Sequence, residues 1–93
     1  MTYSPEMIKQ VAELAANLTP ISDIAVLLEL DVYDLRAAIH DRDSPVSRAY
    51  HRAKAETLLA IRKNELQLAS MGSPLAVQLA GGYAVSMSSD EDL

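Results

Sequence analysis

The spacing of apolar residues along this chain predicts a series of amphipathic helices. All four prolines follow a Ser or a Thr, at Ser4-Pro5, Thr19-Pro20, Ser44-Pro45 and Ser73-Pro74. Proline suits the first position of a helix and favours an extended residue before it, where a Ser or Thr hydroxyl can cap the helix. Because helical apolar periodicity follows each pair, we interpret them as helix starts rather than as turns or phosphorylation sites.

The pattern predicts four helices before Gly72. The first runs from Pro5 to about Leu18, and the second, short and apolar, from Pro20 to Leu28. The third is capped by Asp31 and ends near His40. The fourth, from Pro45 to Met71, would be about 40 Å long. Gly72 is its expected C-terminal stop.

The fourth helix changes character halfway along. One face of its first half is apolar, whereas its second half carries a further apolar face with Arg62 set within it; this face consists of Leu58, Leu59, Leu66 and Ala69. A helix that is apolar on two sides needs two partners. Since a chain of 93 residues can hardly cover both sides, we expect this face to meet another subunit of a homo-oligomer.

Residues 23–39 have the pattern of a helix-turn-helix, whose second helix can enter the major groove of DNA. Asp31 can cap that second helix, and Glu29 stands at the turn where Gly is usual, which predicts a strained or altered turn. The inward positions are apolar: Ala25, Leu28, Leu30, Leu35 and Ile39.

The chain after Gly72 is less regular. Residues 74–80 predict a short helix that Gly81-Gly82 would end, and residues 83–87 fit either a short strand or more helix after a kink. The predicted fold is therefore all-α. It has a helix-turn-helix unit over residues 1–43, oligomerisation helices over 44–87 with a short C-terminal helix or strand, and a mobile acidic tail over 88–93.

Composition and charge narrow the class of protein. The chain is 49% hydrophobic and 23% charged, which describes one ordinary globular domain, and its lack of cysteine fits a reducing cytoplasm. The net charge of −5 is unevenly spread: residues 1–43 hold three basic and eight acidic side chains, residues 44–71 hold five and two, and residues 72–93 hold three acidic ones. The uncharged stretch from 66 to 89 is interrupted by Gln, Gly and Pro, so we expect no membrane span and no export.

Three downstream segments extend the helix-turn-helix pattern. Residues 48–57 read RAYHRAKAET, helical periodicity continues to Ala69, and residues 72–79 read GSPLAVQL. Over residues 20–80 this order resembles the small terminase subunits of tailed bacteriophages. The resemblance implies a non-catalytic subunit that forms a ring of more than four copies in the host cell cytoplasm. It also implies recognition of double-stranded viral DNA and regulation of the large terminase subunit, an ATPase and nuclease, during genome packaging.

The candidate DNA contacts lie on the outer side of the third helix and on the basic segment after it: Tyr33, Arg36, His40, Arg42, Arg48 and Arg52. Arg36 could contact a guanine edge or a phosphate, or it could pair with Asp34 or Glu29 at the surface. Arg48, Arg52, Arg62 and Lys63 form either a basic surface of the assembly or a solvated helix face. Because acidic residues surround the third helix, we expect weak binding per subunit, strengthened by many copies.

Enzymatic functions find no support in the sequence. It has no Gly-rich phosphate loop, no Cys nucleophile, no Gly-x-Ser-x-Gly turn and no His-Glu-x-x-His pattern, so we expect no catalytic residue and no cofactor. His40 and His51 are on different predicted helices, and we interpret them as incidental rather than as metal ligands. Two alternatives stay open, a dimeric helix-turn-helix transcription regulator and an oligomeric interaction module that does not bind DNA. Residues 88–93 either dock on the large subunit or only aid solubility.

Overall fold

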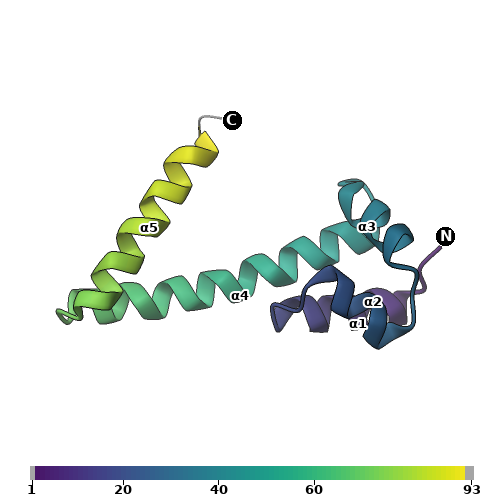
Figure 1. The fold of residues 1–93 in the computed structure, drawn as a ribbon, viewed down its shortest axis with the longest axis horizontal. Coiled ribbons are helices and arrows are strands. Elements are labelled where there is room, and N and C mark those ends of the chain that lie inside the picture. The colour runs from purple at the N-terminus through teal and green to yellow at the C-terminus, as the bar shows by residue number, and fades with distance from the viewer. Residues whose placement is uncertain (1, 92–93) are drawn as a thin grey trace. The chain divides into compact units, whose positions relative to one another are not determined.

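The computed structural model describes residues 2–91, and within them it is all-α, as predicted. Figure 1 shows the helices, whose bounds are α1 Pro5–Ala16, α2 Ile21–Leu28, α3 Val32–His40, α4 Pro45–Ser70 and α5 Pro74–Glu91. The described residues contain no strand. Residues 83–87, for which the sequence left a strand or a helix open, are helical.

Packing divides the chain into two compact units after Thr57. The N-terminal unit, residues 1–57, holds α1, α2, α3 and the first half of α4, and the C-terminal unit, residues 58–93, holds the rest of α4 and α5. The functional division drawn from the sequence lies earlier, after Asp43. The first half of α4 packs with the N-terminal helices because its apolar side is part of their core, as Val46 and Tyr50 show.

Three of the four predicted hydroxyl caps are present. The backbone N–H groups of Met7, Ser47 and Ala76 donate to the hydroxyls of Ser4, Ser44 and Ser73 at 3.2, 3.1 and 3.4 Å respectively. Asp31 likewise accepts from the N–H of Asp34 at 3.0 Å and caps α3, as predicted.

The predicted cap at Thr19 is wrong, and α1 is shorter than expected. Its last residue is Ala16, after which Leu18 adopts a left-handed conformation with φ 58°. The N–H of Thr19 then donates to the Leu14 carbonyl at 3.1 Å. Thr19 therefore helps to close α1, and Pro20 takes the N-cap position of α2 without a side-chain bond.

The core of the N-terminal unit is built from all four of its helices. Its buried members are Val11, Ala15, Ile24, Ala25, Leu35, Ile39, Val46 and Tyr50. The predicted inward positions Leu28 and Leu30 are partly buried against this cluster. The Thr57 hydroxyl donates to the Ala16 carbonyl at 2.6 Å, which fastens α4 to the end of α1. The apolar spacing of the helix-turn-helix is thus confirmed as a packing pattern.

The turn of the helix-turn-helix accommodates Glu29 in a left-handed conformation, with φ 56° and ψ 45°. The N–H of Leu30 donates to the Ala25 carbonyl at 2.8 Å, and the N–H of Glu29 donates to the Val26 carbonyl at 3.3 Å. This is the bonding of a helix end that glycine usually completes. The strain predicted at this turn is therefore present, because Glu29 is a non-glycine residue in the left-handed region.

We expect Glu29→Gly to stabilise the N-terminal unit. A left-handed conformation costs a non-glycine residue about 1–2 kcal/mol, of which glycine's larger unfolded entropy offsets part, so the free energy of unfolding should rise by about 0.5 to 1 kcal/mol. Urea denaturation followed by circular dichroism measures the change. The matched control is Glu13→Gly, the same substitution at an exposed position inside α1, which should lower stability by roughly the same amount. If both substitutions raise the free energy of unfolding, or both lower it, this account of the turn is wrong.

The C-terminal unit is a helical hairpin. Gly72 ends α4 with φ +92°, as predicted for a helix stop. The predicted break at Gly81-Gly82 is wrong, because α5 runs through both glycines, which can adopt helical angles at a cost of about 1 kcal/mol each. The same helix includes residues 88–91, where the sequence predicted a tail, and Asp92 and Leu93 lie outside the described residues.

Candidate nucleic-acid interface and apolar hairpin

The outer face of α3 is open to solvent in the N-terminal unit. Tyr33 is 78% exposed, and Arg36, Ala37 and His40 are also exposed, whereas Leu35 and Ile39 on the opposite side are buried. Val32 is half-buried and packs against the core. The structure thus places Tyr33, Arg36 and His40, the predicted DNA contacts of α3, on one accessible helix face.

Two serine hydroxyls tie the end of α3 to the start of α4. The Ser44 hydroxyl donates to the Ala38 carbonyl at 2.7 Å, and the buried Ser47 hydroxyl donates to the Ile39 carbonyl at 2.5 Å. These carbonyls belong to the last turn of α3, where helical partners are missing. The two bonds fix the end of α3 against the first turn of α4.

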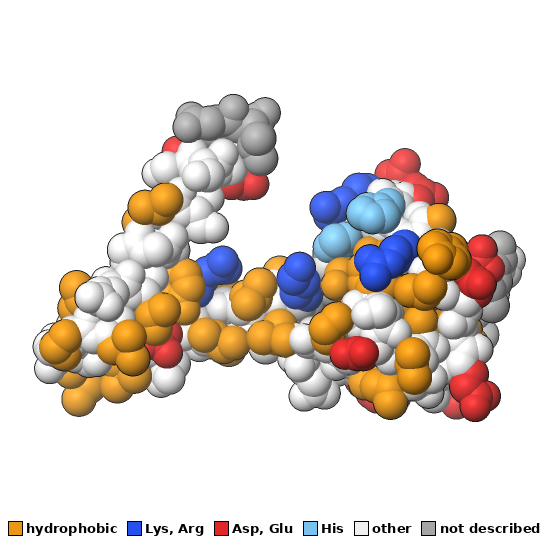
Figure 2. Space-filling model, viewed as in Figure 1, with side chains coloured by type: hydrophobic (Ala, Val, Ile, Leu, Met, Phe, Trp, Pro, Cys, Tyr) orange, Lys and Arg blue, Asp and Glu red, His pale blue; other side chains and the backbone are white. Residues whose placement is uncertain are grey.

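Four basic side chains lie on the segments that form this junction, and we call them the junction cluster: His40, Arg42, His51 and Lys54. Figure 2 shows the histidine side chains gathered with Lys and Arg side chains on one face of the N-terminal unit. The ring of Tyr50 packs edge-on against the ring of His51, with centroids 5.0 Å apart and planes at 86°. His51 is therefore held in place by a buried neighbour, while His40, Arg42 and Lys54 are exposed.

Burial and neighbouring positive charge lower the pKa of His51. Desolvation has the largest effect, followed by the charge of Arg42, while the Ile39 carbonyl acts in the opposite direction as a hydrogen-bond acceptor. Lys54 and His40 lower the pKa further. The charges that act on the His51 ring are thus all positive, which makes this an electropositive spot on an acidic protein.

The other end of α3 is acidic. Burial, and then the charges of Asp34 and Asp31, raise the pKa of Tyr3, whose buried hydroxyl has no hydrogen-bond partner among the described residues. Tyr3, Asp34 and Asp41 line an open depression of about 410 Å³ that runs along α3 to the start of α4. Since phosphate groups are repelled from carboxylates, the face that carries the histidines suits a DNA backbone better than the side of this depression.

The remaining predicted cations lie on α4 and α3. Arg48 and Arg52 are exposed, and the Arg52 Nε lies 2.9 Å from Glu56 Oε1. Both side chains of this pair are more than half exposed, so the pair contributes at most about 1 kcal/mol and a phosphate can compete for the arginine. Within residues 2–91 the structure shows no pairing of Arg36 with Asp34 or Glu29.

The predicted oligomer residues fall into two pairs. Leu58 and Ala69 are partly buried within the single chain, whereas Leu59 and Leu66 are 50% and 53% exposed. Among the described residues of the C-terminal unit only Ala76 is buried. The other exposed apolar side chains of this unit are Ile61, Leu68, Met71, Leu75, Val77, Leu79, Val85 and Met87. Large apolar side chains are thus exposed along both helices of this unit.

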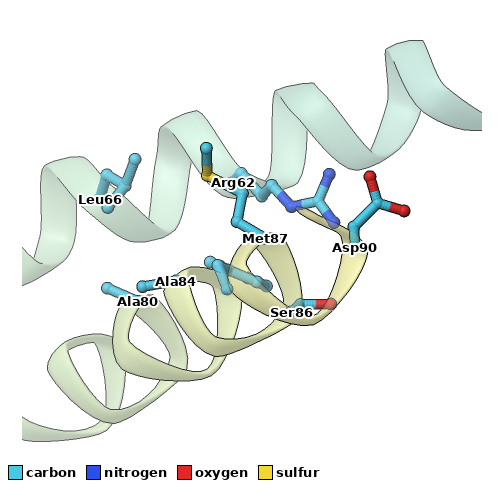
Figure 3. A pocket seen from close by; sticks show the side chains of 8 residues that line it. Arg62, Leu66, Ala80, Ala84, Ser86, Met87 and Asp90 are labelled. Carbon is cyan, nitrogen blue, oxygen red and sulfur yellow. The ribbon is translucent and has the colours of Figure 1, made fainter. Parts of the chain in front are cut away.

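An open groove of about 550 Å³ lies between α4 and α5 in this unit. As Figure 3 shows, Arg62 and Leu66 line it from α4, and Met87 and Asp90 line it from α5. The Arg62 guanidinium carbon is 5.3 Å from the centroid of the Tyr83 ring, within the range of a cation–π contact. Arg62 is therefore directed at its own hairpin, unlike Lys63, which is exposed.

Comparison with protein-family models, curated proteins and solved structures gives no match for this chain. Across residues 2–91, none of the helices combines the length and apolar character needed to cross a bilayer. The sequence pattern did not identify His51 and Lys54 as members of this basic cluster. Their only signal was a spacing of three residues on a predicted helix.

Proposed function

We propose that this protein is a small terminase-like subunit. In this proposal it is non-catalytic, assembles into a ring through its C-terminal unit, binds double-stranded viral DNA through its N-terminal unit, and regulates the large terminase subunit in the host cell cytoplasm. The observation that carries the proposal is the exposed apolar hairpin, which shares the continuous helix α4 with an open helix-turn-helix. The resemblance in the order of segments supplies the biological setting.

The arrangement of leucines on α4 favours a ring over a dimer. Leu59 and Leu66 are seven residues apart and share one side of the helix, while Ile61 and Leu68, also seven apart, share a side about 160° away at roughly 100° per residue. All four are at least 39% exposed. Two different apolar sides allow each subunit to contact two neighbours by unlike surfaces, and such contacts form a ring where the rotation between neighbours closes.

The charges of the N-terminal unit support DNA binding that is weak for one subunit. The positive side chains lie at the α3–α4 junction and on the outer side of α4, while carboxylates lie at the start of α3. A single copy can therefore meet only a few phosphates. Several copies on one duplex would add their contacts through a high effective concentration.

The test is a titration of the full-length protein with duplex DNA at a series of salt concentrations. We expect affinity to fall steeply with salt, and the double variant Arg48→Ala, Arg52→Ala to reduce the salt slope because two phosphate contacts are lost. Arg36→Ala should change the sequence preference if this residue contacts a base, by about 1–3 kcal/mol at the affected base pair. Fluorescence anisotropy measures both effects.

Each alternative has a distinct outcome in this test. Absence of duplex binding at low salt would establish the interaction module in place of the DNA-binding subunit. A dimeric protein that binds one two-fold symmetric site would identify a transcription regulator. Equal losses of affinity on all sequences for Arg36→Ala would make that residue a phosphate contact.

A further inference from the structure

We infer that the junction cluster is a binding site for the phosphates of duplex DNA, and that DNA binding there is coupled to uptake of a proton by His51. The inference rests on the proposed function and deepens it. It adds His51 and Lys54 to the DNA contacts, and it makes the affinity depend on pH in a defined direction.

The geometry of the cluster comes from three successive segments. His40 lies in the last turn of α3, Arg42 lies in the loop that follows, and His51 and Lys54 lie one turn apart on α4. The Ser44 and Ser47 hydroxyl bonds fix these segments to one another, and the Tyr50 ring orients His51. Because the segments that carry these positive side chains are held together without a ligand, the cost of bringing the segments together for an anion is already met in the folded chain.

Two acidic residues near the cluster are directed elsewhere. In the α3–α4 loop, the Asp41 carboxylate accepts a hydrogen bond from the N–H of Asp43 at 3.2 Å and lines the depression beside Tyr3. On α4, Glu56 pairs with Arg52. The groups whose charges act on His51 are Arg42, Lys54 and His40, from the loop, α4 and α3. Within residues 2–91 none of the four cluster side chains forms an ion pair with a carboxylate, so their charge is available to an external anion.

The coupling to a proton follows from the state of His51 in the free protein. Burial and the neighbouring cations hold its pKa below the ordinary value of 6.5, so it is mostly neutral near neutral pH. A phosphodiester placed against the cluster offsets those positive charges and favours the protonated ring. The pKa of His51 then rises on binding, the complex takes up a proton from solvent, and affinity increases as the pH falls.

The experiment is an anisotropy titration of full-length protein with a duplex at constant ionic strength, at about pH 6 and about pH 8. The wild type should bind about three- to fivefold more tightly at the lower pH, which is the effect of a rise of about one pKa unit on binding when the free pKa lies below 6.5. His51→Gln should abolish most of this ratio. Lys54→Gln should weaken binding at both pH values, whereas Lys9→Gln, which removes the same charge from an exposed position on α1, should not.

The fold must be monitored in the same samples, because the depressed pKa of His51 has the opposite effect on stability. The folded chain binds this proton less readily than the unfolded chain, so its stability is greater above the unfolded value of about 6.5 and decreases as the pH falls below it. Circular dichroism at both pH values shows whether each variant stays folded. His51→Lys, which is charged throughout, should bind at about pH 8 as tightly as the wild type does at about pH 6.

Several results would overturn the inference while leaving DNA binding intact. One is a wild-type pH ratio that His51→Gln preserves, and another is loss of the ratio in His40→Gln alone. Equal affinities of Lys54→Gln and Lys9→Gln would also remove the site from the junction. Failure of the wild type to bind duplex at either pH would instead overturn the proposed function itself.

Discussion

The double variant Leu59→Glu, Leu66→Glu is expected to dissociate the oligomer into smaller species. These side chains are 50% and 53% exposed in the single chain and lie on the same side of α4, so they are available to a neighbouring subunit. Burying a leucine side chain contributes roughly 1.5–3 kcal/mol, and burying an unpaired carboxylate in its place costs several kcal/mol more. Two such changes repeated at every interface exceed what a typical contact between subunits can absorb. Native mass spectrometry of the purified protein measures the mass of the assembled species and thus the number of subunits.

Ala60→Glu, Gln67→Glu is the matched control for this variant. It adds the same two charges to exposed positions seven residues apart on the same helix, between the two apolar sides of α4. The control should keep the wild-type mass, because glutamate on a solvated helix face costs little. A wild type that is monomeric or dimeric at micromolar concentration would contradict the proposed ring, and equal dissociation of both variants would show that net charge alone causes the effect.

Leu35→Ala is expected to destabilise the N-terminal unit strongly. Leu35 is 0% exposed and belongs to a core cluster of only eight buried residues. Removing a buried leucine side chain typically costs about 2–5 kcal/mol, through lost burial and the cavity that remains. A small domain is stable by only about 5–15 kcal/mol, so this loss is a large share of the total.

Thermal denaturation followed by circular dichroism at 222 nm, a wavelength that reports helix content, measures the loss of the N-terminal unit. The control is Leu27→Ala, the same substitution at a position of α2 that is 62% exposed, which should change stability by at most about 0.5 kcal/mol. If the two variants melt alike, the helix-turn-helix is not braced by the core described here.

The local signals in the sequence were sufficient for most of the fold. A serine before a proline marked the starts of α1, α4 and α5, because both the capping hydroxyl and the fixed φ of proline act within one turn. The same signal gave a wrong prediction at Thr19, because the backbone N–H of that residue donates to the Leu14 carbonyl at the end of α1. Whether Thr19 closes α1 or caps α2 depends on how α1 packs, and the local sequence pattern does not show this.

The candidate site was less predictable than the fold. Single side chains on the outer face of α3 followed from helical periodicity, and the structure finds Tyr33, Arg36 and His40 exposed there. The junction cluster did not follow, because it requires α4 to dock on the end of α3 through the hydroxyls of Ser44 and Ser47. Docking of this kind is a tertiary event, and the ten residues between the two histidines gave no sign of it.

The uninterrupted course of α5 through Gly81 and Gly82 ties the order of its backbone to protein concentration. An isolated helix of 18 residues is marginal in water, and two interior glycines weaken it by about 1 kcal/mol each. No atom lies within 4 Å of the place where a Cβ would stand on either glycine, so neighbouring side chains do not compensate. In the proposed ring, amide protons around the pair should therefore exchange quickly with solvent in a dilute chain and slowly once subunits cover the helix. A subunit that orders α5 only as it joins would make assembly of the proposed ring cooperative, with few partly formed species between free chain and closed ring.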